Sequence, residues 1–322
     1  MTQTTTTDGP SYEPVPRVSG EPPYPPDLVA KSNGLMRATL DLLGHASAAT
    51  QLARMVAAKY PVHAERAKAN AAVIGVDPLE LLTANLCYDF ALGMSGMGCS
   101  TMALAGPDGP VLARNMDWFP EAKVARASCL VTEDYGVNAG FLGMLGVVTA
   151  QSRNGFCVCL NAALGGSDLT GYPVLLFLRH VLDTATSYRE ALEMVTTERL
   201  MTGGIVTVVG TRNDERAVVE RLPNRAAVRS ATGDEPLLAT NHYRALAAAE
   251  GCPRYDHLAA NAGRQPPLEV LTSRQVLQEI TAQHVVLCPA KQTAEMFVPR
   301  HLLAEDYREG LSVVDAMGFL TS

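Results

Sequence analysis

Three residues near the start of the middle third of the chain carry side chains that together can perform thiol chemistry. Cys99 follows a glycine-rich stretch, and Arg114 and Asp117 come 15 and 18 residues later. The turn GPDG at 106–109 separates two short apolar runs and predicts a hairpin whose second strand ends beside Cys99. Such a hairpin would bring a thiol, a guanidinium and a carboxylate together. On spacing alone, a buried cysteine beside a surface Arg–Asp pair is the more common arrangement, so both interpretations stay open.

Other kinds of reactive site find little support. None of the seven histidines forms an HxH or HExxH motif, and there is no CxxC. Cys157 and Cys159 point to one face of a predicted strand; without a second ligand pair, they are interpreted as buried structural cysteines. The glycines at 93–98 match neither a phosphate-binding loop nor the GxSxG elbow of serine hydrolases. We therefore expect no metal and no cofactor.

The composition describes a charge-poor chain that can build a large core. Of its 322 residues, 47% are hydrophobic and 18% are charged, and the net charge is −7. This acidic balance, without any run of basic residues, disfavours nucleic-acid binding. The sequence contains no run of ~18 apolar residues, so it predicts no membrane span. Seven cysteines, an odd number, fit reduced thiols. Because the N-terminus also lacks the apolar core of a secretory signal, the expected location is cytoplasmic.

The elements that must position these residues change in character at Cys99. Residues 1–27 are rich in Thr, Pro and Gly and are predicted to form a disordered arm. Residues 28–98 are expected to be helical, with a capped helix start at Asp77. Residues 99–322 alternate short β-branched runs with turns, which predicts a sheet protein with helices stacked against it in one domain. Within this part, helices are predicted over 173–183, 187–197 and 272–282.

The segment CSTMALAGPDGPVLARNMDW at 99–118 resembles the start of the mature chain in N-terminal-nucleophile cysteine hydrolases. This superfamily includes choloylglycine hydrolase, penicillin V acylase, acid ceramidase and N-acylethanolamine acid amidase. Its pattern is Cys-Thr, a hairpin and Arg-Asn-x-Asp. Three further segments resemble the ceramidase-like branch in the same order: PLELLTANLCYDF, FLGMLGVVTAQSRNGFCVCLN and LLATNHY. The resemblance therefore extends over most of the chain after residue 78.

This resemblance implies an α+β fold, a four-layer αββα sandwich. Residues 28–98 would be the helical α-chain or propeptide, and residues 99–322 the catalytic β-chain. The implied activity is that of a cysteine amidohydrolase that cuts its own Gly98–Cys99 bond and then cleaves linear non-peptide amides through an acyl-thioester. Its partner would be a small-molecule N-acyl amide, and a homo-oligomer stays open. Two alternatives remain: an acyltransferase of the isopenicillin-N acyltransferase type, which His242 fits, and an uncleaved, non-catalytic binding protein.

The resemblance also assigns roles to five residues. Cys99 would supply the nucleophilic thiol and, once its nitrogen is freed, an α-amine with a pKa near ~7.7–8.0 that accepts the thiol proton. Arg114 would favour the thiolate, and Asp117 would hold the amine. Asn241 would donate its side-chain amide to the oxyanion, and Asn161 is carried over as a second active-site residue.

Three positions depart from the pattern of the superfamily. Ser100 replaces the usual Thr, Ala113 replaces a common Gly, and Ala162 stands where the amidase branch has an acidic residue. The resemblance therefore implies the reaction class, but not the exact substrate of that branch. Seven apolar side chains are candidates for an acyl pocket, although such residues more often belong to the core: Met102, Met116, Trp118, Phe119, Phe141, Met144 and Leu145.

Overall fold

Short apolar runs separated by tight turns build two β-sheets, which the computed structural model describes over residues 11–44, 47–90, 97–247 and 251–308. Sheet A has six antiparallel strands. In spatial order they are β1 (Tyr12–Pro14), β14 (Thr293–Pro299), β13 (Thr281–Cys288), β4 (Val111–Trp118), β3 (Met97–Leu104) and β12 (Leu237–Ala239). The hairpin predicted around residues 106–109 is the β3–β4 pair at the centre of this sheet.

Sheet B has eight strands and lies face to face with sheet A. In spatial order they are β11 (Arg225–Ser230), β10 (Arg216–Leu222), β9 (Gly204–Val209), β8 (Phe156–Asn161), β7 (Thr149–Ser152), β6 (Gly136–Phe141), β5 (Ser128–Glu133) and β2 (Arg17–Ser19). Only β2 pairs in parallel, with β5. Cys157 and Cys159 are fully buried in the apolar layer between the sheets, which confirms their interpretation as structural residues.

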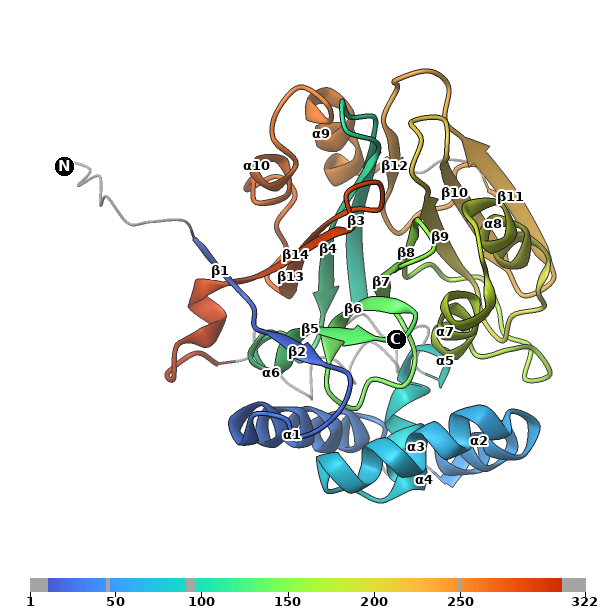
Figure 1. The fold of residues 1–322 in the computed structure, drawn as a ribbon, viewed down its shortest axis with the longest axis vertical. Coiled ribbons are helices and arrows are strands. Elements are labelled where there is room, and N and C mark those ends of the chain that lie inside the picture. The colour runs from blue at the N-terminus through green and yellow to red at the C-terminus, as the bar shows by residue number, and fades with distance from the viewer. Residues whose placement is uncertain (1–10, 45–46, 91–96, 248–250, 309–322) are drawn as a thin grey trace.

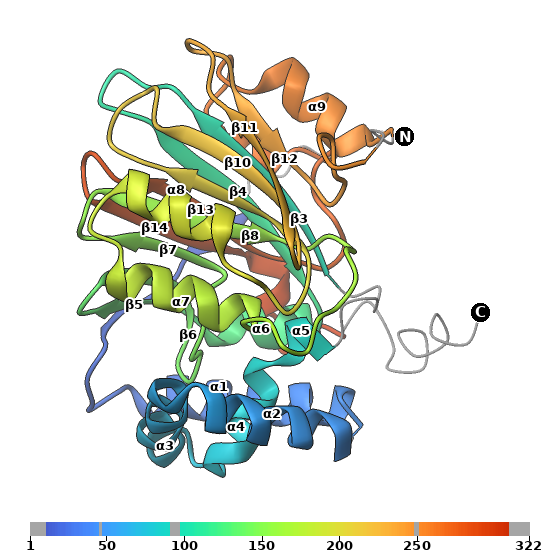
Figure 2. The same ribbon diagram turned by 90° about the vertical axis from the view of Figure 1, so that its right-hand side faces the viewer.

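Helices cover the outer faces of both sheets (Figure 2). The apolar α7 (Val174–Thr184) and the amphipathic α8 (Tyr188–Thr197) pack on sheet B. On the other side, α9 (Pro253–Asn261) and the short α10 (Pro267–Leu271) pack on sheet A. The short helices α6 (Glu121–Ala127) and η1 (Arg300–Leu303) contact each other near β1 and β13. The resulting order of helix, sheet, sheet and helix confirms the predicted αββα sandwich.

The helices that precede Cys99 gather at one end of the sandwich (Figure 1). They are α1 (Pro26–Leu42), α2 (Ser47–Lys59), α3 (Pro61–Ile74), α4 (Pro78–Asn85) and α5 (Cys87–Phe90). Asp77 caps α4 as predicted, since its carboxylate accepts from the backbone N–H groups of Leu79 and Glu80. Among the described residues, no helix has both the length and the hydropathy needed to cross a membrane.

Two sequence predictions are wrong. Residues 12–19 form β1 and β2, which extend one edge of each sheet, so the described part of the expected disordered arm is ordered. Pairing with β14 and β5 satisfies the backbone hydrogen-bonding groups of these two strands. Amino-acid composition does not indicate such pairing, so the sequence could not predict it. The helix expected over 272–282 is a series of turns followed by β13, because Thr281 already pairs with β4 and accepts a hydrogen bond from the backbone of Gln278. Residues 1–10 lie outside the described part.

Candidate active site

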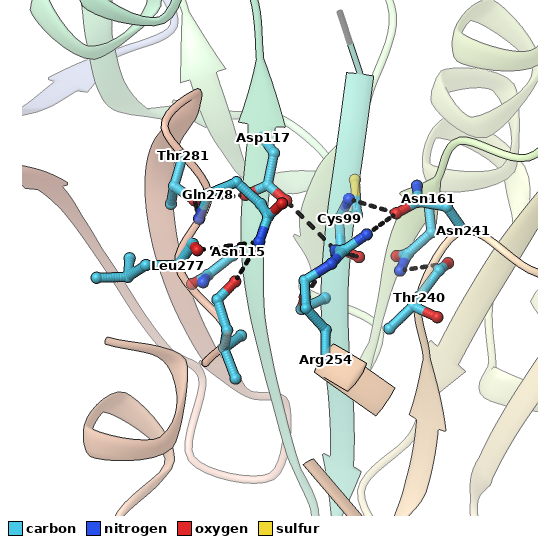
Figure 3. A network of polar contacts seen from close by, with 12 residues as sticks. Cys99, Asn115, Asp117, Asn161, Thr240, Asn241, Arg254, Leu277, Gln278 and Thr281 are labelled. Carbon is cyan, nitrogen blue, oxygen red and sulfur yellow. Dashed lines mark hydrogen bonds and ion pairs between the residues drawn. The ribbon is translucent and has the colours of Figure 1, made fainter. Parts of the chain in front are cut away.

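The β3–β4 hairpin places Cys99 at the end of the sandwich, with different partners on the two faces of its strand (Figure 3). In the antiparallel register, Cys99 lies opposite Met116, and Gly98 lies opposite Asp117. Because side chains alternate along a strand, the Cys99 sulfur and Arg114 face sheet B, while Asp117 faces the opposite way, toward α9. The thiol and the carboxylate thus approach the Gly98–Cys99 peptide bond from opposite sides of one strand.

A buried guanidinium contacts the Cys99 sulfur. Arg114, which has no exposed surface, donates from Nη2 to Cys99 Sγ over 2.6 Å and from Nη1 to Thr149 Oγ1 over 2.7 Å. In the described part of the chain, no carboxylate forms an ion pair with this arginine. The negative charge that best compensates Arg114 is therefore a thiolate at Cys99, since a buried cation is costly without a counter-charge.

In the uncut chain, the thiol is nevertheless held in its protonated form. Burial raises the pKa of the Cys99 thiol, and this effect outweighs the opposing influence of Arg114. The nearby Asp117 carboxylate raises the pKa further, whereas a hydrogen bond from the backbone N–H of Ala162 lowers it. Without a base beside it, the sulfur stays a thiol at neutral pH.

Asp117 lies on the outer face of sheet A, against the backbone of Gly98. Its Oδ1 accepts from Thr281 Oγ1 over 2.7 Å, and its Oδ2 lies 3.5 Å from Nη1 of Arg254. Burial raises the pKa of Asp117, against the lowering effects of the Thr281 hydrogen bond and of the two arginines. A side chain at residue 98 would put its Cβ 3.0 Å from Asp117 Oδ2, so a glycine is needed for this close approach.

Arg254 joins the two halves of the site, and the sequence analysis did not single it out. Its Nη1 donates to the backbone oxygen of Cys99 over 2.8 Å and to Ser100 Oγ over 3.0 Å, and its Nη2 donates to Asn241 Oδ1 over 2.8 Å. The residue lies in the first turn of α9, directly after Pro253. A cation there opposes the helix dipole, and no helix was predicted at this position, so the sequence analysis had no signal for Arg254.

Asn241 contacts the backbone nitrogen of Cys99. Its Oδ1 accepts from Cys99 N over 3.0 Å (Figure 3). Its Nδ2 donates to the backbone oxygen of Ala162 over 2.8 Å. The side chain therefore spans from β3 to the end of β8. This geometry puts an amide donor and the N–H of Ala162 on the side of Cys99 where the sulfur lies.

A buried carboxylate holds the loop that carries Asn241. Glu220 of β10 has no exposed surface, and its oxygens accept from three consecutive backbone N–H groups, those of Arg244, Ala245 and Leu246, over 2.8–2.9 Å. Three converging N–H groups form a concave anion site, which Glu220 fills. The loop is thereby fixed to sheet B immediately after Asn241.

Asn161 lies beside the site but turns its side chain away from the sulfur. Its Oδ1 accepts from Thr101 Oγ1 over 2.7 Å, and its Nδ2 donates to the backbone oxygens of Ala239 and Thr240 over 3.2 and 3.1 Å. The side chain thus ties β8 to β3 and to the end of β12. All five residues selected from the sequence meet in one region, with Asn161 in a bridging place between the two sheets.

Four of the seven apolar candidates line a cavity next to the site, between the helical segment and the sheets: Met116, Trp118, Phe141 and Met144. Two of the others pack elsewhere: Met102 against α9 and α10, and Leu145 in the main core. The cavity also receives residues of α1 and α4, so it lies between the parts of the chain before and after Cys99.

The fold is that of the N-terminal-nucleophile hydrolase superfamily. Within it, the chain belongs to the acyl-coenzyme A:6-aminopenicillanic acid acyl-transferase family, whose model matches residues 104–285, more than half of the chain. The matched region contains Arg114, Asp117, Asn161, Asn241 and Arg254, and it begins just after Cys99.

Among individual proteins, the chain is similar to the N-acylethanolamine-hydrolyzing acid amidase of Caenorhabditis elegans, with 24% identity over 177 residues. That match covers 49% of this chain and 50% of the relative, so the chain spans about half the length of the curated relative it matches. The solved structure of a C. elegans ortholog of this amidase aligns with a TM-score of 0.52 and 21% identity, over 60% of this chain and 93% of that one.

A mutant conjugated bile acid hydrolase from Clostridium perfringens aligns more weakly. Its TM-score is 0.38 and its identity 13%, over 66% of this chain and 98% of that one. The structural likeness to the C. elegans ortholog supports the fold alone.

Proposed function

We propose that this chain is a self-processing cysteine hydrolase that cleaves the amide bond of a small N-acyl amide through an acyl-thioester on Cys99. One observation carries the proposal: a buried guanidinium contacts the Cys99 sulfur, while a polar network of Asn241, Arg254 and Asp117 surrounds the backbone of the same residue. This arrangement supports a cysteine whose thiol and nitrogen act together. The amidase relative supports amide hydrolysis as the reaction class.

Self-processing supplies the base that the uncut site lacks. The Cys99 sulfur attacks the carbonyl carbon of Gly98, the carbon–nitrogen bond breaks, and the thiol proton moves to the nitrogen that leaves. Water then hydrolyses this thioester to a Gly98 carboxylate and a free thiol. The new α-amine, with a pKa near ~7.7–8.0, replaces an amide nitrogen that cannot accept a proton.

In turnover, the α-amine takes the thiol proton, and the Arg114 guanidinium stabilises the resulting thiolate. The sulfur attacks the substrate carbonyl, whose oxygen becomes an oxyanion. The proposal assigns this oxyanion two donors near Cys99, the Asn241 Nδ2 and the Ala162 N–H. Loss of one such donor typically costs ~2.7–4 kcal/mol. The protonated α-amine then delivers its proton to the leaving amine, and water resolves the acyl-thioester. Asp117 and Arg254 hold the amine and the backbone in place, and Asn161 keeps β8 and β3 together.

A second candidate differs only in the last step. The family model is named for an acyl-transferase, and in that reaction an amine, rather than water, would take the acyl group from Cys99. The described geometry around the sulfur serves both outcomes equally, because the acceptor attacks the thioester after the first amine has left.

The test is product analysis with purified protein and a panel of N-acyl amines, bile-salt conjugates and phenoxyacyl β-lactams. We expect at least one member to release free acid and amine, and the matched variant Cys99→Ala to release neither. Addition of a second amine distinguishes the rival: an acylated acceptor as the main product identifies a transferase. Turnover that survives in Cys99→Ala would contradict the proposal, as would the absence of turnover across the panel in processed protein.

A further inference from the structure

The cavity next to the site is narrow and adaptable. It has a volume of about 30 Å³, room for about one water molecule. Its walls include Met36 of α1, Met116 of β4 and Met144, together with Trp118. Methionine side chains are unbranched and flexible, and they re-pack readily around a ligand. A cavity with three of them can widen to admit an apolar group.

A row of three side chains links this cavity to the proposed nucleophile. Cys99 lies directly opposite Met116 on β4, and Met116 lies directly opposite Gln283 on β13. Side chains that face each other in an antiparallel pair lie on the same face of the sheet. Strands are spaced about 4.8 Å apart, so Gln283 stands roughly 10 Å from Cys99 along this row. Met116 and Gln283 both line the cavity.

Gln283 presents an unpaired hydrogen-bond acceptor. Its side chain has no exposed surface, and Nε2 donates to Ser128 Oγ over 2.6 Å. The single proton of that hydroxyl is donated to the Val124 backbone oxygen, so the hydroxyl can only accept from Gln283. This fixes the amide orientation and leaves Oε1, which has no partner among the described residues, as an acceptor.

A second acceptor lies close by. Asn138 Oδ1 is also buried and has no partner in the described part of the chain. It lies 3.3 Å from the position that a Cβ would take on Gly140, which lines the cavity. A buried acceptor left without a donor costs about 1–3 kcal/mol, so an apolar cavity with two such atoms beside it is suited to a ligand that carries donors.

We propose that Gln283 makes this cavity selective for acyl groups that bear a hydroxyl or another hydrogen-bond donor roughly 10 Å from the scissile carbonyl. The inference rests on the proposed function, which places the substrate carbonyl at Cys99. An acyl chain attached to the sulfur then extends past Met116, and its donor meets Oε1 of Gln283. A plain alkyl chain of the same length would leave that oxygen unpaired.

The test measures binding of free acids, the products of the reaction, to the full wild-type chain. Dodecanoate is compared by calorimetry with a series of its mid-chain hydroxy derivatives. We expect one or two positions of the hydroxyl to bind about tenfold more tightly than plain dodecanoate, as one satisfied buried acceptor predicts. Equal binding across the series would overturn the inference, since it would mean that a trapped water donates to Gln283 in place of the ligand. This comparison uses wild-type protein alone.

Two variants then assign the effect. Gln283→Met keeps the side-chain volume but removes the acceptor, so it should abolish the preference for the hydroxy acid. Gln151→Met is the matched control, because Gln151 is also buried with an unpaired Oε1 but does not line the cavity. A preference that persists in Gln283→Met, or that disappears in Gln151→Met, would contradict the assignment. Since binding of acids requires no turnover, selective binding without any amide cleavage would refute the proposed function and leave the subsite standing.

Discussion

At the level of single residues, Cys99 is governed by two opposed effects. Burial keeps its proton on the sulfur, whereas Arg114 at 2.6 Å stabilises the thiolate once that proton has somewhere to go. In the uncut chain, the nitrogen of Cys99 is an amide that already donates to Asn241. In the proposed mechanism, the cation and the amide donor are thus already in place, and the base is supplied by the cut.

The Glu220 carboxylate gives a prediction at this scale. Because Glu220 anchors the loop after Asn241, Glu220→Gln should misplace the Asn241 amide and lower kcat by roughly 10–100-fold with little change in KM. Asn241→Ala should lower kcat by a larger factor. Kinetics of the two single variants and the double variant check this, since in the Asn241→Ala background the Glu220→Gln change should have almost no further effect. Additive losses in the double variant would show that Glu220 acts independently of Asn241.

The proximity of Cys99, Arg114 and Asp117 could be predicted from the sequence because a short hairpin joins them. The pairing of its two strands follows from a tight turn between apolar runs. Arg254 was not identified from the sequence, because it lies on a helix that docks from a distant part of the chain. Such docking depends on packing between elements and leaves no spacing in the sequence. Asn161 and Asn241 were selected only through resemblance, for the same reason.

At the level of elements, a buried carboxyl group is one of the contacts that tie α5 to the sandwich. Asp89 Oδ1 accepts from the N–H of Val174, the first residue of α7, and from Thr202 Oγ1 over 3.0 and 2.8 Å, while Oδ2 has no partner among the described residues. Burial raises the pKa of Asp89 to about 7, although both hydrogen bonds lower it. The helix before the proposed cut is therefore anchored by a carboxyl group that favours its neutral form.

This anchor predicts how stability depends on pH. The folded pKa of Asp89 lies above the unfolded value near ~3.9, so the stabilisation of the neutral form is complete below about pH 4 and is lost as the pH rises through 7. The contribution of Asp89 to the unfolding free energy should therefore fall between pH 5 and pH 8, by up to about 3 kcal/mol. The buried His63 and His284, whose pKa values burial lowers to about 3 and about 4, contribute in the opposite direction over this range, so the Asp89 contribution is read as a difference between two proteins. The first is uncut Cys99→Ala protein, unfolded in urea at each pH.

The matched comparison adds Asp89→Asn to that protein. Asparagine keeps an oxygen for Val174 and Thr202 but cannot ionise. The stability of the double variant relative to the Cys99→Ala protein should therefore rise by up to about 3 kcal/mol from pH 5 to pH 8, because the histidine contributions cancel in this difference. At pH 8 the double variant should not be the less stable protein. An unchanged slope would exclude Asp89 as the responsible group.

Among the elements, those with a strong periodic pattern were predictable. The strands from β3 to β10 that have β-branched runs, and the helices α7 and α8, appear where the sequence places them, with Ser187 accepting from the Glu190 N–H as its capping pattern predicts. By contrast, β1, β2 and β12 have only three residues each. Their pairing is decided by neighbouring strands, so their own sequence carries too little pattern to identify them.

At the level of the whole molecule, the helical segment is bound to the sandwich by more than the Gly98–Cys99 bond. Tyr88 donates to the backbone oxygen of Gly203 over 2.8 Å, and a buried His63 lies 2.8 Å from the Tyr172 hydroxyl. Burial lowers the pKa of His63 to about 3, so this contact stays neutral at physiological pH. Apolar side chains of α1 to α4 share one core with sheet B and α7. Two chains produced by the cut would therefore remain associated.

The intact mass of purified wild-type protein, read together with its activity, tests the central claim most directly. The account predicts two masses, those of residues 1–98 and 99–322, that migrate as one species under native conditions. It also predicts that Cys99→Ala gives a single mass of the whole 322-residue chain without activity. A wild-type protein that remains a single uncut chain and yet turns over N-acyl amides at full rate would contradict the account, because an amide nitrogen at Cys99 cannot take the thiol proton.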